Sequence, residues 1–472
     1  MIRNNGARER PGVVMRGTGR AVLVVALGVP LLVSSVGTSV AAPEPVPVTD
    51  GLRPDAVLGW SANAGAAAIA ACIAPTDNPL HEARMYAMAH LAIHDALNAI
   101  DRRSTPYAYD EAAPANASPA AAVAAAARGV LVPAIRELPE PFPPDCIDAG
   151  VASVEAAYDE AIAAIPPGQP RTRGIEVGEA AAAAVLALRY GDGSDTPLLV
   201  FDFPQGSEPG EYRYTPGQTF AFAPGWADVT PFVLADGSEY QPGPPLSIDS
   251  RRYTRDFRQV KRLGGDDVTT PSDRNEEQTE IAYFWLESSP LAWNRLARTV
   301  AKSEHLDLWE NARLFGLLNM ALADGYTASF DTKYDELFWR PVTAIQTAAT
   351  DGNPRTEADP TWTPLVATPP IPDYDSAHAV EGGAAAAVLR KVLGTDDIAF
   401  EACSLLLPEG SRCNDATPVM RHFESFSAAA VENGVSRTYV GFHFRDAVEA
   451  GKNHGRKIGN AAVRRYLEPV AG

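Results

Sequence analysis

Apolar residues recur every three to four positions along most of the chain, the spacing of amphipathic α-helices. In the first half this pattern predicts helices over residues 81–98, 118–138, 151–165 and 174–190. Later it predicts helices over residues 272–285, 292–303, 306–339, 379–393, 417–432 and 437–467. From about residue 191 to 245, Gly, Pro, Asp and aromatic residues replace the helical period, and we expect long ordered loops with at most a short hairpin. The predicted class is all-α, with a helical bundle that holds a site in the C-terminal half.

The first 42 residues have the order of a secretory signal. Arginines come first, an apolar run over 21–36 follows, and small residues at 38–42 offer a cleavage site. The apolar run is short for a membrane span and contains Pro30, but an N-terminal membrane anchor is the alternative interpretation. We expect a secreted or exported protein with no membrane contact after signal removal, an N-terminal helical region over 43–245 and a C-terminal catalytic region over 246–472.

The charge balance excludes some partners. The chain has a formal net charge of −19, and removal of the signal, with its five arginines and one glutamate, leaves −23. Such a chain is a poor nucleic-acid binder, so an anionic ligand would need a local basic pocket.

The four cysteines suggest disulfides, because an even count is typical of exported chains. Cys403 and Cys413 flank a short loop that they could close, which leaves Cys72 with Cys146. The chain has no CxxC motif, so a zinc site or a redox dithiol is not expected.

The first of three chemical motifs is Lys333-YDELFW-Arg340-Pro341. Seven residues are almost two helical turns, so Lys333 and Arg340 would share one face of a helix that Pro341 ends, and together they could hold an anion. The alternative is that Glu336 pairs with either cation on a solvated surface.

The second motif is a proline-stiffened loop that ends in Asp375-Ser376-Ala377-His378 and runs into a helix rich in Gly and Ala. That helix should start at Asp375 or Ser376, so a hydroxyl, free backbone amides and an imidazole would converge near its positive end. Small residues over 382–387 would let other helices pack closely. The alternative is an ordinary helix cap with an exposed histidine.

The third motif is Ser436-Arg437-TYVGF-His443. Six residues are not a same-face helical spacing, so we expect Arg437 at or before a helix start and His443 further inside that helix.

Together, the order K-x6-RP, DSAH and SR-x5-H resembles the signature of vanadium haloperoxidases and of the acid phosphatases and type-2 phosphatidic acid phosphatases related to them. Further stretches over most of residues 80–467, such as ENARLFGLLNMALADGYTASFDTKYDELFWRPVTAI and GFHFRDAVEAGKNHGRKIG, resemble the bacterial branch of haloperoxidases. The resemblance implies an all-helical fold and a vanadate cofactor.

The resemblance also assigns roles. Lys333, Arg340 and Arg437 would neutralise the oxygens of vanadate or phosphate, and Ser376 with the Ala377 amide would hydrogen-bond further oxygens. His443 would bond vanadium, or be the nucleophile of a phosphatase, and His378 would be the acid–base group. Lys333 would also polarise bound peroxide, which places it with the two histidines among the catalytic residues.

Three positions depart from the family pattern. Asp375 and Ala377 stand where the family usually has Pro and Gly, and a carboxylate near the pocket would oppose an oxyanion unless it turns away and caps the helix. The family's Asp four residues beyond the metal-binding histidine is also missing, because position 447 is Ala447.

The favoured function is therefore oxidation of halide by hydrogen peroxide to hypohalous acid. The alternatives are hydrolysis of a phosphomonoester in the same pocket and non-catalytic oxyanion binding, and an oligomeric assembly is left open. His90 and His94, one helical turn apart, suggest either a metal pair or, preferably, helix packing. His305, His422 and His454 have no obvious partners in the sequence.

Overall fold

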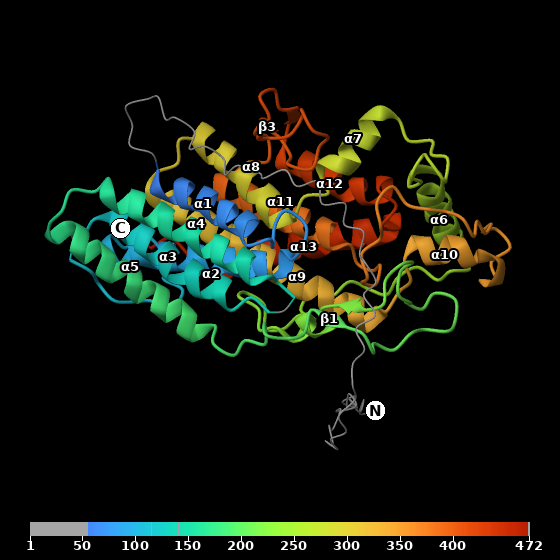
Figure 1. Cartoon of the computed structure of the whole chain (residues 1–472), viewed down its shortest axis with the longest axis horizontal. Helices are drawn as coiled ribbons and strands as arrows, with labels where there is room; N and C mark the ends of the chain where they lie inside the picture. Colours follow the sequence, from blue (N-terminus) through green and yellow to red (C-terminus); the bar gives the residue numbers. More distant parts are fainter. Residues whose placement is uncertain (1–54, 115, 140, 471–472) are drawn as a thin grey trace, which may run out of the picture. The chain divides into compact units, whose positions relative to one another are not determined.

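The computed structural model describes residues 55–114, 116–139 and 141–470. The predicted signal segment, residues 1–42, lies outside them. The regular secondary structure of the described chain is mostly helical (Figure 1). These are α1 (Ala56–Ala70), α2 (Pro79–Ile100), α3 (Pro119–Arg136), α4 (Pro144–Ala163), α5 (Gln169–Leu188), α6 (Arg251–Leu263), α7 (Glu276–Phe284), α8 (Ser289–Ser303), α9 (Leu308–Glu336), α10 (Pro341–Thr347), α11 (Ala377–Leu393), α12 (Phe426–Tyr439) and α13 (Arg445–Arg465), with short 3₁₀ turns at Pro224–Asp228 and Ala348–Thr350. The all-α prediction is confirmed.

The strands are short and lie outside the bundle. β1 (Leu199–Val200) pairs antiparallel with β2 (Ala221–Phe222), and β3 (Phe400–Ala402) pairs antiparallel with β4 (Arg421–Phe423). The first pair lies within the loop-rich segment, but residues 201–220 separate its strands, so it is not the short hairpin that was expected. The second pair was not predicted, and it replaces the start of the helix expected over 417–432.

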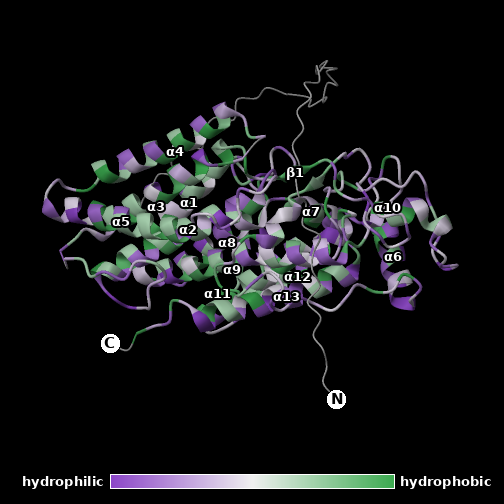
Figure 2. Ribbon diagram, turned by 90° about the horizontal axis from the view of Figure 1, so that it is seen from below, coloured by the Kyte–Doolittle hydropathy of each residue, from purple (hydrophilic) through white to green (hydrophobic). Residues whose placement is uncertain are grey.

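The N-terminal helices begin where the sequence supplies caps. The Asn78 side chain accepts a hydrogen bond from the His81 amide at the start of α2, and Ser118 does the same for Ala121 at the start of α3. A proline in the first turn of each helix fits that position, where its missing N–H is not needed. α2, α3 and α5 pack together, and their alanine-rich faces are largely buried (Figure 2).

Helices α11 and α13 share the most extensive helix–helix contact among the described helices, and glycines line it. A Cβ atom on Gly455 would lie 1.8 Å from the Val380 carbonyl oxygen, and one on Gly383 would lie 2.3 Å from the Lys452 carbonyl oxygen. The expectation that the Gly/Ala-rich helix admits close neighbours is confirmed. This contact sets the start of α11 beside the start of α13.

Three helices were missed in the sequence, α1, α6 and α10. α6 carries so many charged residues that few apolar positions mark its helical pattern. Even so, Tyr253, Phe257 and Val260 form a buried stripe along it. The boundary expected near residue 245 stays a prediction.

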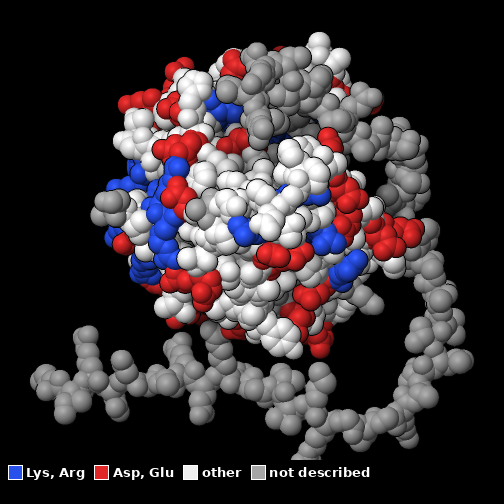
Figure 3. Space-filling model, turned by 90° about the vertical axis from the view of Figure 1, so that its left-hand side faces the viewer, with Lys and Arg blue, Asp and Glu red and all other residues white. Residues whose placement is uncertain are grey.

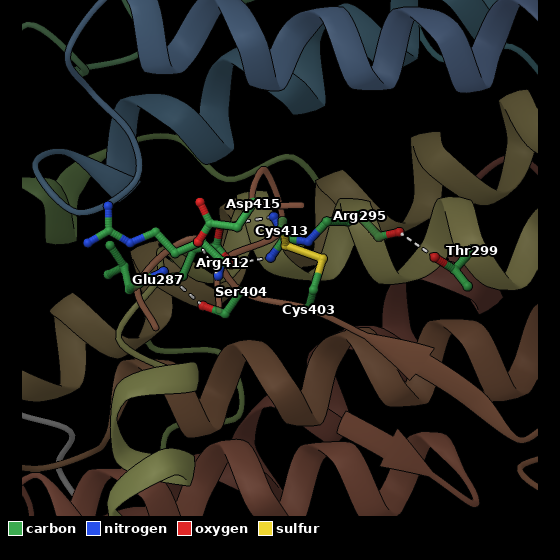
Figure 4. The surroundings of a disulfide bond; sticks show 9 residues. Glu287, Arg295, Thr299, Cys403, Ser404, Arg412, Cys413 and Asp415 are labelled. Atoms are coloured by element: carbon green, nitrogen blue, oxygen red, sulfur yellow. Dashed lines mark hydrogen bonds and ion pairs between the residues drawn. A yellow bond between two sulfur atoms is a disulfide. The ribbon is translucent and has the colours of Figure 1, made fainter. Parts of the chain in front are cut away.

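Both expected disulfides are present. Cys72 pairs with Cys146 and Cys403 with Cys413, which leaves no free cysteine in the described chain. The 403–413 loop lies near the ion pair between Glu287 and Arg295, and the adjacent strand β3 packs against α8 (Figure 4).

Among the described helices, α3 alone is long and apolar enough to cross a membrane. It packs against α2, α4 and α5 and is mostly buried, as expected for a core helix. Acidic and basic side chains are interspersed on the molecular face shown in Figure 3.

Candidate functional site

Lys333 lies in the last turn of α9 and is fully buried. Its ammonium donates hydrogen bonds to the carbonyl oxygens of Pro372 (2.9 Å), Asp373 (3.0 Å) and Asp375. Burial, and then the nearby positive charge of Arg340, lower the pKa of Lys333 to about 7. The lysine therefore holds the loop before α11 against the end of α9.

Arg340 is not on the same helix as Lys333, so that prediction is wrong. α9 ends at Glu336, Leu337 adopts a left-handed conformation with φ of 47°, and Arg340 is the N-cap of the next helix, α10. Its guanidinium donates to the carbonyl oxygens of Ile371 (2.6 Å) and Phe442 (2.9 Å). Because Lys333 and Arg340 are both buried, the alternative of a solvated surface pair with Glu336 is also wrong.

Arg437 lies in the last turn of α12, and His443 lies in the loop just before α13. The prediction that Arg437 begins a helix containing His443 is therefore wrong. Gly434 does not break α12, because its missing side chain makes room for Val448 of α13. The connecting turn nevertheless brings both residues to the pocket, where Arg340 Nη1 lies 2.9 Å from His443 Nε2.

Ser376 is the N-cap of α11, which confirms the predicted start of this helix. Ser376 Oγ and Arg437 Nη2 are both buried without a hydrogen-bond partner in the described chain. Ala377 provides the first helical amide, which has no partner within the helix. These two unpaired donors lie with the buried cations described above, so a polar ligand would fit between them.

His378 follows in the first turn of α11, with Nε2 3.3 Å from the carbonyl oxygen of Glu287. Burial, and then the positive charge of Arg437, lower its pKa well below the usual value. The same causes act on His443, whose pKa is lowered by burial and then by Arg340. Both imidazoles are therefore neutral near pH 7 in the ligand-free pocket.

His443 has a carboxylate neighbour that the sequence analysis missed. His443 Nδ1 lies 3.0 Å from Asp373 Oδ1, and both side chains are buried. Asp373 comes from the loop before α11, whereas the family's usual aspartate would stand on α13 at the position of Ala447. The sequence places Asp373 seventy residues from His443, and no spacing rule links them.

The carboxylate of Asp375 turns away from the pocket. Ser329 Oγ donates to its Oδ1 at 2.7 Å, and His454 Nδ1 lies 2.9 Å from its Oδ2. The side chain makes no cap, so the cap prediction is wrong, although the preferred orientation away from the oxyanion is observed. His454, for which the sequence offered no partner, is thus the partner of Asp375.

The other histidines do not form a second centre. His94 bonds Asp95 and Ser104, and His90 packs against Phe315, as the helix-packing interpretation expects. No cluster of three or more His, Cys, Asp or Glu suited to a metal ion occurs in the described residues. His422 lies 3.0 Å from Glu401 on the surface.

The pocket thus gathers three buried cations, Lys333, Arg340 and Arg437, from three different helices. The positive charges depress the pKa values of their neighbours, and Arg340 and Arg437 themselves have pKa values lowered to about 10 and about 9, first by burial. Such a cluster is electrostatically unfavourable until an anion enters it. The fold and the pocket together define a class: helical-bundle proteins with a buried cationic pocket.

Comparison with known proteins identifies that class. Residues 313–472 match the model of the VCPO second helical-bundle domain, and the chain is 24% identical to the vanadium chloroperoxidase of Curvularia inaequalis over 80% of this chain and 76% of that protein. The chain is therefore similar to vanadium haloperoxidases, and the likeness includes the second helical-bundle domain of that family over residues 313–472.

Solved structures agree on the fold. The first bacterial vanadium-dependent iodoperoxidase superposes with a TM-score of 0.70 at 23% identity, covering 90% of this chain and 99% of that one. The holo form of a bacterial vanadium-dependent chloroperoxidase superposes with a TM-score of 0.65 at 17% identity, covering 88% and 98%.

Proposed function

We propose that the protein is a vanadate-dependent haloperoxidase, which converts halide, hydrogen peroxide and a proton to hypohalous acid and water. The observation that carries the proposal is the convergence of unpaired buried donors, Ser376 Oγ and Arg437 Nη2, with three cations and His443. A tetrahedral oxyanion needs several fixed donors of this kind, because each replaces a water in a site of low dielectric.

The residues present fit vanadate. Lys333, Arg340 and Arg437 would balance its charge, and His443 would offer Nε2 to the metal. The Ser376 hydroxyl and the Ala377 amide would donate hydrogen bonds to its remaining oxygens. Bound vanadate supplies Lewis-acid activation of peroxide. His378, neutral at the edge of the pocket, would exchange the proton that the reaction consumes.

Phosphomonoester hydrolysis is the competing function, because phosphate has the same shape and the same donors would hold it. The deciding experiment measures purified metal-free protein with and without orthovanadate, on a brominatable dye with peroxide and on p-nitrophenyl phosphate. Bromination that depends on vanadate supports the proposal. Hydrolysis without bromination replaces it with a phosphatase, and vanadate binding without either activity identifies a non-catalytic oxyanion-binding protein.

Two histidine variants separate the roles. His443→Ala should abolish tight orthovanadate binding in isothermal titration, whereas His378→Ala should bind and fail to turn over. Equal vanadate affinity in wild type and His443→Ala would remove the assignment of His443.

We also propose that the protein is exported, on the basis of the order of residues 1–42. Mass spectrometry of the mature protein should find a chain that starts near residue 42 or 43. A mature chain that retains the arginines of the first segment would contradict export by cleavage.

A further inference from the structure

The most concentrated positive charge outside the oxyanion pocket lies on α6. Arg251, Arg255, Arg258 and Arg262 follow one another at helical intervals of four, three and four, which places them on one face. The opposite face is the buried stripe of Tyr253, Phe257 and Val260 that packs toward the core.

Two further arginines complete a groove. Arg355, from the loop after α10, and Arg445, at the start of α13, line the same groove as the four α6 arginines, together with Thr254 and Gln259. Its volume is about 680 Å³, and no carboxylate lines it. None of the lining residues belongs to the oxyanion pocket.

Most of this charge is not neutralised within the protein. Arg255 lies 3.3 Å from Asp256 and Arg262 lies 3.4 Å from Asp273, and the charge of Asp256 also acts on Arg445, so two carboxylates stand against six arginines. Arg258 and Arg355 donate to backbone carbonyl oxygens, and Arg251 and Arg445 have no hydrogen-bond or ion-pair partner among the described residues.

This arrangement has an energetic cost. Like charges at helical intervals of three and four repel one another and destabilise a helix. It also stands out in a chain whose net charge is −19, where a basic surface of this density is not a by-product of composition. A bound polyanion would remove the repulsion.

We propose that the α6 groove binds a small, multiply charged oligophosphate. Guanidinium groups bind phosphate oxygens through paired hydrogen bonds, and six of them around one groove match a ligand with several phosphates rather than a single halide. The volume is in the range of small-molecule sites. A long polyanion is disfavoured, since the acidic remainder of the surface repels it, and the groove has no aromatic side chain on which a nucleobase could stack.

The test uses tripolyphosphate as the probe and isothermal titration of the purified full chain at low ionic strength. The double variant Arg251→Gln/Arg445→Gln removes two arginines whose side chains make no hydrogen bond to the described residues, so it breaks no hydrogen bond of the fold. We expect it to weaken tripolyphosphate binding by about tenfold or more, and we expect added salt to weaken wild-type binding. Wild type should gain thermal stability on adding tripolyphosphate, and the double variant should gain much less.

Two controls separate this groove from other sources of binding. Arg136→Gln/Arg464→Gln removes the same charge elsewhere on the surface and should bind like wild type. Arg437→Gln alters the oxyanion pocket and should also keep tripolyphosphate binding, so failure of the proposed peroxidase function would leave this result unaffected. Equal affinity in wild type and the groove variant, equal loss in either control, or equally tight binding of citrate would overturn the proposal.

Discussion

Asp373→Asn tests whether this carboxylate positions the histidine proposed to bind vanadium. Asp373 Oδ1 lies 3.0 Å from His443 Nδ1 in a buried setting. A proton on Nδ1 would keep the lone pair on Nε2, which here faces Arg340 Nη1 at 2.9 Å and would exchange that partner for the metal, and the carboxylate would make the imidazole a stronger ligand. The asparagine keeps the size of the side chain and removes its charge.

The substitution has two effects of opposite sign. Loss of a partner to a metal-binding histidine typically weakens metal affinity by about 10- to 100-fold. Loss of a negative charge near an oxyanion strengthens binding, but the positive charges of Lys333 and Arg340 beside Asp373 already offset much of that charge. We therefore expect a net loss of about tenfold in vanadate affinity, or about 1.4 kcal/mol.

Orthophosphate separates the two effects, because when it binds reversibly it responds to the charge of the pocket but forms no bond to His443. The ratio of vanadate to phosphate affinity, measured by titration, should fall about tenfold in Asp373→Asn. Burial raises the pKa of Asp373 to about 7, so the wild-type carboxylate is ionised above this pH and protonated below it. The difference from wild type should thus be present at pH 8 and shrink toward pH 6. An unchanged ratio at pH 8 would refute the positioning role.

Three further substitutions have expected outcomes. Asp375→Asn should lower the unfolding free energy by about 1–3 kcal/mol in urea, because it disturbs the buried contact with His454, while orthovanadate affinity stays unchanged; tenfold tighter binding would show that this charge reaches the pocket. Burial raises the pKa of Glu82 to about 8, above its usual 4.5, so the folded state loses stability as pH rises between these values. Glu82→Gln should therefore be more stable than wild type above pH 8, by several kcal/mol, on the order of the free energy that corresponds to this pKa shift. Parallel urea midpoints of the two proteins from pH 5 to 9 would contradict this. Gly455→Ala should cost about 1–3 kcal/mol or more through overpacking, whereas Gly59→Ala, with nothing within 4 Å, should gain about 0.5–1 kcal/mol; equal melting temperatures would contradict the close contact of α11 and α13.

The sequence identified the pocket residues more reliably than the elements that carry them. Lys333 and Arg340 meet in one pocket, as expected, but a left-handed residue and an irregular link separate them. Leucine seldom adopts a left-handed conformation, so the sequence around Leu337 does not predict it. Its cause is tertiary: the Leu337 carbonyl accepts from the Tyr212 amide, and the Trp339 amide donates to Gly210.

For α6 and α12, the hydrophobic pattern failed to predict the helices for other reasons. In α6, arginines fill the exposed face so fully that only four apolar positions mark the buried one. In α12, Gly434 resembles a helix stop, yet it sits within the helix because a side chain there would collide with Val448. A glycine can mark the end of a helix or a close contact inside one, and only the packing partner distinguishes the two cases.

The loop before α11 shows why single motif positions are poor guides to activity. Asp375 looked like a charge that would repel an oxyanion, but Ser329 and His454 hold it on the far side of the loop. Asp373, two residues earlier, looked unremarkable, yet it lies beside His443. Both outcomes depend on residues far away in the sequence and on the contact of α13 with α11. The charge of a motif residue therefore bears on chemistry only through the partner that the fold gives it, and here the fold gives each aspartate a histidine.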